Sequence, residues 1–159
     1  MGLFLPLTAA PVPLTTSIRK LSLVYAGILV VFAVAQLFLF EDLRIHFETL
    51  WEGMGGLALA MASLIVVAEV AALPFLLGMQ LGKGLRWVSI VAGWAVPLLW
   101  LLVVGCTLTN QTQMADVGFL AGLVTLEPGL WAVFFCLALG ILSIWASWGM
   151  WPGRGAAKK

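Results

Sequence analysis

The chain has 159 residues, of which 63% are hydrophobic and only 9% are charged, whereas soluble domains carry about a quarter charged residues. Folded in water, such a chain would expose large contiguous apolar patches, which soluble monomers avoid. The length fits one domain. The formal net charge of +1 excludes the basic stripe that binding to nucleic acid requires. We therefore expect the chain to fold in a lipid bilayer.

Four apolar stretches are long enough to cross a bilayer, whose core of about 30 Å needs roughly 20 helical residues. They lie at about 21–40, 54–81, 87–108 and 129–151. None shows the alternation of a membrane barrel, and helices satisfy their own backbone hydrogen bonds in lipid. We expect an all-α fold, an integral membrane four-helix bundle over 21–151. A segment at 1–20 and a basic tail at 152–159 flank it.

Charged residues predict the orientation of this bundle. Basic residues precede the first span, lie between the second and third, and close the chain: Arg19, Lys20, Lys83, Arg86, Arg154, Lys158 and Lys159. The two other loops carry one basic residue, Arg44, and six acidic ones: Glu41, Asp42, Glu48, Glu52, Asp116 and Glu127. Because basic loops stay in the cytoplasm, we expect both termini inside, in a bacterial cytoplasmic (inner) membrane.

The two outer loops differ in character. The loop at 41–53 sets apolar residues against its charges and is expected to lie along the membrane surface; those residues are Leu43, Phe47, Leu50 and Trp51. The loop at 109–128 is unusually apolar but too short to span. We expect it to be a re-entrant or interfacial segment.

Glu69 is the one ionisable residue deep inside a predicted span, where a charge costs at least about 2.5 kcal/mol. Helical spacing places it on the same side as the small residues Ala58, Ala62 and Ala72, so it should face the bundle. Two interpretations stay open. Glu69 is either a proton-accepting or quinone-facing acid, or a protonated side chain that joins two helices. Counted by depth, Trp94 or Ser143 could hydrogen-bond to it, which makes all three candidate cofactor-binding residues.

The remaining polar candidates favour ordinary structural roles. Cys106 and Cys136 differ in depth by about 10 Å, too far for a disulfide, so two free buried thiols are expected. His46, the only histidine, is expected to be a solvated surface residue because metal sites need several ligands. We predict no metal site. Gln36, near the outer end of the first span, is expected to hydrogen-bond to the first outer loop.

The second span and its continuation read ALAMASLIVVAEVAALPFLLGMQLGKGLRWVSIVAG over 58–93. An embedded glutamate, an apolar run ending in Leu-Leu-Gly and a short basic turn into the next span resemble the DoxX/MauE-like family of small four-helix membrane proteins. The first span running into an acidic amphipathic loop is also similar. The resemblance implies membrane redox work, either quinone-linked sulfur oxidation or thiol-disulfide exchange. MauE-like members carry two closely spaced cysteines after the third helix, whereas this chain has only Cys106 there.

No nucleophile–base pair, metal cluster or pair of carboxylates within one span can be assembled from the sequence. We therefore expect a small membrane subunit that packs into a larger assembly of other membrane proteins, one concerned with electron transfer. The alternative is a DoxX/MauE-type quinone- or thiol-linked oxidoreductase, in which Glu69 and Cys106 would be catalytic and quinone the cofactor. A third reading is a small transporter with Glu69 as the proton carrier, although no inverted repeat supports it.

Overall fold

A computed structural model of the chain describes residues 13, 15–51, 54–109 and 116–150. These residues form five helices and no strand. The helices are α1 (Thr16–Phe38), α2 (Phe40–Leu50), α3 (Gly55–Leu76), α4 (Lys83–Thr109) and α5 (Leu130–Gly149). All but the short α2 are long and apolar enough to cross a membrane. The prediction of an all-helical fold with four apolar spans is therefore confirmed.

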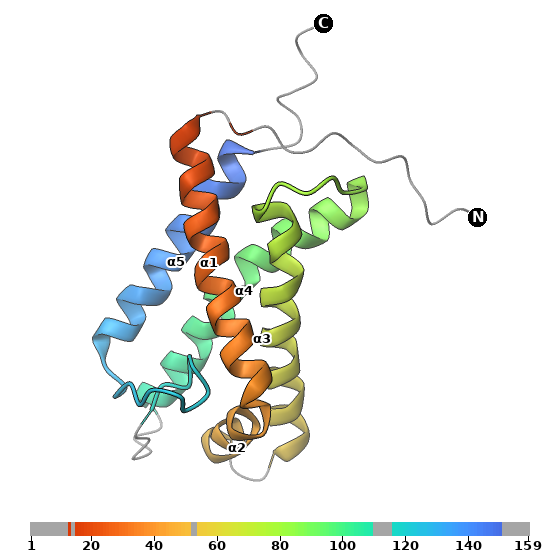
Figure 1. Cartoon of the computed structure of the whole chain (residues 1–159). Coiled ribbons are helices and arrows are strands. Elements are labelled where there is room, and N and C mark those ends of the chain that lie inside the picture. The colour runs from red at the N-terminus through yellow and green to blue at the C-terminus, as the bar shows by residue number, and fades with distance from the viewer. Residues whose placement is uncertain (1–12, 14, 52–53, 110–115, 151–159) are drawn as a thin grey trace, which may run out of the picture.

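The four long helices form a ring in which each packs on two neighbours (Figure 1). Helices α1 and α4 each pack on both α3 and α5, while α2 lies across one end of the bundle against α3. The start of α1 and the end of α5 meet at the opposite end, where Gly149 lies against the Ile18 side chain. We call this the terminal end, and the end that holds α2 the loop end.

The outward faces of the four long helices are apolar. Large side chains that are at least 45% exposed occur along the full length of each one: Val24, Val31 and Val34 on α1, Leu64, Val67 and Val70 on α3, Val88, Val91 and Leu98 on α4, and Phe134, Ile141 and Ile144 on α5. A soluble protein does not present such surface to water. These faces suit contact with lipid acyl chains.

Two helix boundaries differ from the prediction because capping residues end or extend the apolar runs. Helix α3 ends at Leu76 and not near 81, because Gly78 adopts a φ of +74°. The Met79 N–H then donates to the Pro74 carbonyl and the Gly78 N–H to the Phe75 carbonyl, a Schellman cap. Helix α1 begins at Thr16, since the Thr15 hydroxyl accepts a hydrogen bond from the Ile18 N–H.

The other boundaries also differ from the prediction by a few residues. Helix α1 ends at Phe38, and α4 runs from Lys83 to Thr109, beyond the expected 87–108. Helix α5 occupies Leu130–Gly149, and the predicted last residue of that span, Trp151, lies outside the described residues together with the tail at 152–159.

Serine and tyrosine hydroxyls tie α1, α3 and α4 together near the terminal end. The Ser89 hydroxyl donates to the Ala72 carbonyl and accepts from the Phe75 N–H, at 3.1 Å each. It thus satisfies α3 around Pro74, a residue that removes a backbone donor from the helix. The Tyr25 hydroxyl donates to the Gly93 carbonyl at 2.7 Å. Hydrogen bonds of this kind stabilise helix association in lipid.

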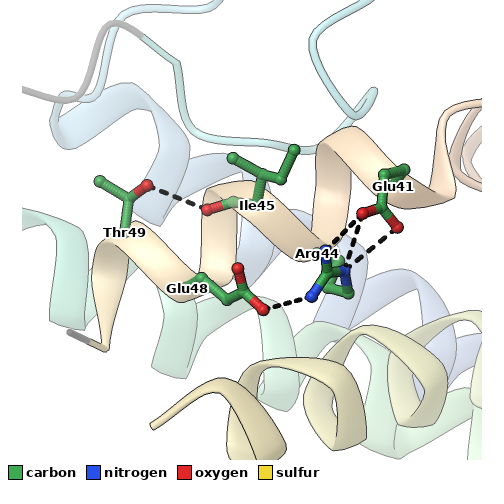
Figure 2. A network of polar contacts seen from close by, with 5 residues as sticks. All are labelled: Glu41, Arg44, Ile45, Glu48 and Thr49. Atoms are coloured by element: carbon green, nitrogen blue, oxygen red, sulfur yellow. Dashed lines mark hydrogen bonds and ion pairs between the residues drawn. The ribbon is translucent and has the colours of Figure 1, made fainter. Parts of the chain in front are cut away.

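The two outer loops both pack on the bundle. The first is largely the helix α2, and its apolar residues Leu43, Phe47 and Leu50 are buried in the protein core. On its outer face Arg44 bridges Glu41 and Glu48, which lie one helical turn to either side of it (Figure 2). In the last loop, 116–129, Val117, Phe119 and Ala121 are buried. The apolar residues of α2 and the first part of the last loop therefore pack against the bundle, whereas Leu123 and Val124 remain exposed.

Candidate functional site

Glu69 lies at the centre of the ring of helices and is 0% exposed. It follows Ala58 and Ala62 and precedes Ala72 on one face of α3, and all three alanines are also fully buried. Their small side chains allow neighbouring helices to approach closely. The prediction that Glu69 faces the bundle is confirmed.

The Glu69 carboxyl joins three helices through one of its oxygens. Gln36 Nε2 of α1 and Trp100 Nε1 of α4 each donate to Glu69 Oε1 at 3.1 Å. Both donors are neutral groups. Gln36 and Trp100 are themselves 0% exposed, so the cluster is fully enclosed by protein.

The predicted partners of Glu69 are therefore wrong. Trp94 Nε1 donates instead to the Ser147 hydroxyl at 2.8 Å, and the Ser143 hydroxyl donates to the Gly140 carbonyl at 2.9 Å. The prediction compared only the depths of these residues along their helices. Whether a side chain contacts Glu69 also depends on the direction in which it points from its helix. Trp94 and Trp100 are six residues apart on α4, which is about 9 Å in height and well off a whole number of turns, so only one of them points at Glu69.

Gln36 extends the cluster to the last loop. Its Nε2 also donates to the Phe119 carbonyl at 3.1 Å, so both amide hydrogens are used. This corrects the expected bond to the first outer loop. Two buried acceptors, Glu69 Oε2 and Gln36 Oε1, have no hydrogen-bond partner. The Glu69 cluster, defined as Gln36, Glu69, Trp100 and the Phe119 carbonyl, thus fixes α1, α3, α4 and the loop in one arrangement.

Aromatic side chains close the loop end of this cluster. The Phe119 ring contacts Trp100 edge-on, with centroids 4.8 Å apart, stacks on Phe32 at 5.8 Å and meets Phe135 at 5.3 Å. Edge-to-face contacts at such distances add stability beyond burial alone. Sequence reasoning missed Trp100 and Phe119. The sequence feature that could have indicated Trp100 is an indole N–H on the apolar span that follows the span with the buried acid.

The two cysteines do not join the cluster. Both are free thiols, with Cys136 buried and Cys106 half-buried, which confirms that no disulfide links them. The hydrogen bonds of the Glu69 carboxyl come from Gln36 and Trp100, so Cys106 and Glu69 do not form a bonded pair.

His46 on α2 is half-buried and not a solvated surface residue. Its ring lies against the backbone of Gly118, where an added Cβ would come within 2.9 Å of Nε2. Nε2 is buried without a hydrogen-bond partner. Burial lowers the pKa of His46 below its usual value, and nearby Asp116 and the Val117 backbone oppose that shift. The imidazole therefore helps to hold the last loop in contact with α2.

An open apolar groove of about 590 Å³ separates parts of α4 and α5. We call it the α4/α5 groove. Trp94 and Pro97 line its α4 side together with two leucines. Its α5 side combines small residues with large apolar ones: Cys136, Gly140, Ser143 and Ser147, and Leu137, Ile141, Ile144 and Trp148. Two predicted binding residues, Trp94 and Ser143, thus meet here, whereas Glu69 does not line the groove. Within the described residues, no group of three or more His, Cys, Asp or Glu side chains is placed to hold a metal ion.

No protein-family model, curated protein or solved structure matches the chain. The resemblance to DoxX/MauE-like proteins therefore stays a prediction that rests on the residues at 58–93. What the geometry of the described residues defines is a helical bundle of membrane-protein character, with an enclosed polar cluster and a lateral groove between α4 and α5.

Proposed function

We propose that the protein is a small integral membrane subunit of a larger assembly, and that the α4/α5 groove receives a transmembrane helix of a partner. The groove carries this proposal. It opens sideways, where lipid or another helix would lie, and its lining is almost wholly apolar. The floor of the groove holds the buried small residues Cys136, Ser143 and Ser147, and exposed apolar side chains such as Ile141 and Ile144 flank it; small residues of this kind allow membrane helices to approach closely.

The enclosure of the Glu69 cluster favours a structural role for the protein, as a subunit, and not a catalytic one. A proton carrier or quinone-facing acid has to reach its substrate, whereas Glu69 is 0% exposed and its contacts join structural elements. We infer that Glu69 fixes the shape of the bundle and thereby the width of the groove. This role agrees with the structural interpretation of an acid within a span.

The nature of the assembly and its membrane are further parts of the proposal. We propose an electron-transfer complex, on the resemblance of residues 58–93 to DoxX/MauE-like proteins. We also propose a bacterial cytoplasmic membrane with both termini inside. Arg19 and Lys20 at the terminal end, and the acidic α2 at the loop end, support this orientation through the positive-inside rule.

The groove also supports a second candidate function, a quinone-linked oxidoreductase. Its volume of about 590 Å³ falls within the range of small-molecule sites, and the Trp94 indole and the Cys136 thiol line it. In this alternative the groove holds the quinone, and Glu69 acts only through the shape of the bundle. Proton-coupled transport, the third reading, gains no support from a carboxyl that is closed on all sides.

Mild detergent extraction from the native membrane tests the proposal. We expect the protein to copurify with a partner at fixed stoichiometry. Gly140→Leu should abolish this, since the nearest side-chain atom to an added Cβ is Pro97 Cβ at 4.0 Å and the larger side chain would fill the groove. Gly105→Leu is the matched control, because Gly105 on α4 has open space around it and does not line the groove.

Two outcomes contradict the subunit proposal. Purification of the protein as a lone monomer under these mild conditions would exclude a stable partner. Equal retention of the partner by Gly140→Leu and Gly105→Leu would exclude the groove as the contact. Extraction of quinone with the wild type, and its loss in Gly140→Leu, would favour the second candidate instead.

A further inference from the structure

Basic residues gather at the terminal end of the bundle. Arg19 and Lys20 lie in the first turn and a half of α1, and Lys83 and Arg86 lie at the start of α4. The acidic residues in the described part of the chain lie elsewhere: Glu41, Asp42 and Glu48 on α2, Asp116 and Glu127 in the last loop, and Glu69 in the core. The N-termini of α1 and α4 add partial positive charge at this end, and the C-termini of α3 and α5 add partial negative charge.

Arg86 is the unusual member of this group because it is buried. It is 9% exposed. Its Nη2 donates to the Met150 carbonyl at 3.2 Å, at the C-terminal end of α5, and its guanidinium lies over the Phe75 ring, 5.9 Å from the centroid. Its Nε is buried without a hydrogen-bond partner. A buried cation is costly unless a counter-charge compensates it.

Arg44 shows how this chain pairs an arginine when a carboxylate is at hand. On the exposed face of α2 it contacts both Glu41 and Glu48 (Figure 2). These are the ion pairs found in the described residues, and Arg86 takes no part in them. Within the described residues, two carboxylates thus pair with a partly exposed arginine and none with the buried one. An anion from outside the described residues would complete the site of Arg86.

Arg19 lies close enough to contribute to the same site. Its Nη1 is 3.5 Å from where a Cβ of Gly78 would lie, just after α3 ends, and Arg86 covers Phe75 three residues earlier. The two arginines therefore flank the 75–78 segment from α1 and from α4. Arg19 is exposed, which leaves it available to a ligand at the membrane surface.

We propose that an anionic phospholipid binds at the terminal end, with its phosphate held by Arg86 and Arg19 and its acyl chains along the apolar outer face of α4. Basic pockets between membrane helices at the membrane surface recognise lipid head groups in this way. Arginine suits the task since its planar guanidinium can bind a phosphate through two nitrogens. The exposed Trp87, next to Arg86, suits the boundary between head groups and acyl chains. This inference does not depend on the α4/α5 groove or on its occupant.

The test uses the full chain in neutral detergent micelles with increasing amounts of phosphatidylglycerol or of phosphatidylcholine. Bound lipid is counted by native mass spectrometry, and the unfolding temperature is measured in parallel, since a ligand that binds the folded state raises it. We expect phosphatidylglycerol to bind and to raise the unfolding temperature, and phosphatidylcholine to do neither. Arg19→Gln and Arg86→Gln should each weaken binding of phosphatidylglycerol about fivefold, the loss expected for one basic residue near a lipid surface.

Arg44→Gln is the matched control, because it removes one positive charge from the opposite end of the bundle, and it should bind phosphatidylglycerol like the wild type. Arg19→Gln keeps the test decisive if Arg86→Gln fails to fold, since Arg19 is exposed. Equal binding of both lipids, or an equal loss in Arg44→Gln, would overturn the proposal. Inorganic phosphate that stabilises the protein as well as phosphatidylglycerol would also overturn it, because the site would then recognise a free anion and not a lipid.

Discussion

Replacement of Glu69 by Leu and by Gln separates the role of its hydrogen bonds from the role of its charge. Leu removes two hydrogen bonds, from Gln36 and Trp100. Hydrogen bonds between membrane helices average about 0.6 kcal/mol, and the Trp100 N–H would be left buried without a partner at a further cost of about 1–3 kcal/mol. Gln36 keeps its bond to Phe119. We expect Glu69→Leu to lower the free energy of unfolding by about 2–4 kcal/mol.

Glu69→Gln keeps an acceptor oxygen in the same place and adds an N–H that can donate to the unpartnered Gln36 Oε1. We expect it to cost less than about 1 kcal/mol. The assay is equilibrium unfolding by sodium dodecyl sulfate in mixed micelles, followed by circular dichroism. The double variant Trp100→Phe/Glu69→Leu should be less destabilised than the sum of its single changes, because the two residues share a bond. If Glu69→Gln proved as costly as Glu69→Leu, a charged carboxylate would be required and the structural role of the cluster would be refuted.

Two predictions concern the contact between α2 and the last loop. The folded-state pKa of His46 is lowered from 6.5 by burial, so the unfolded state binds the proton more readily. Stability contributed by neutral His46 is thus complete above about pH 6.5 and lost as the pH falls below it. His46→Gln should flatten this part of a plot of unfolding temperature against pH, and an unchanged slope would contradict the assignment. Gly118→Ala should be more destabilising than Gly122→Ala in the same assay. Both glycines have positive φ angles of +89° and +84°, but only at Gly118 does a Cβ meet His46, at 2.9 Å. Backbone strain alone accounts for about 1–2 kcal/mol at each position, so equal losses would show that the loop does not rest on His46.

The four spans could be predicted because hydropathy and length are local properties. Their ends were less predictable, since single capping residues decide them. Gly78 ends α3 before the apolar run stops, and the Thr15 hydroxyl starts α1 before the run begins. The position of Glu69 on the same face of α3 as Ala58, Ala62 and Ala72 could also be predicted, because helical periodicity places residues on one side of a helix regardless of its neighbours.

The partners of Glu69 could not be predicted, because contacts between helices depend on which helices are neighbours and on how each is rotated. Depth alone suggested Trp94, whereas rotation of α4 turns Trp100 toward the carboxyl. The last loop posed a different problem. Its apolar residues suggested contact with lipid, but the positive φ angles at Gly118, Ala121 and Gly122 make tight turns that direct Phe119 into the protein.

The central claim is that the chain crosses the membrane as a four-helix bundle, with the terminal end and the loop end on opposite sides. It is tested most directly by single cysteines introduced into a background in which Cys106 and Cys136 are replaced by alanine. The sites are Ser17→Cys at the exposed start of α1 and Thr49→Cys on the exposed face of α2. An impermeant thiol reagent applied to intact cells should label Thr49→Cys alone, and Ser17→Cys only after permeabilisation. Labelling of both positions in intact cells, or recovery of the protein in the soluble fraction without detergent, would contradict the claim.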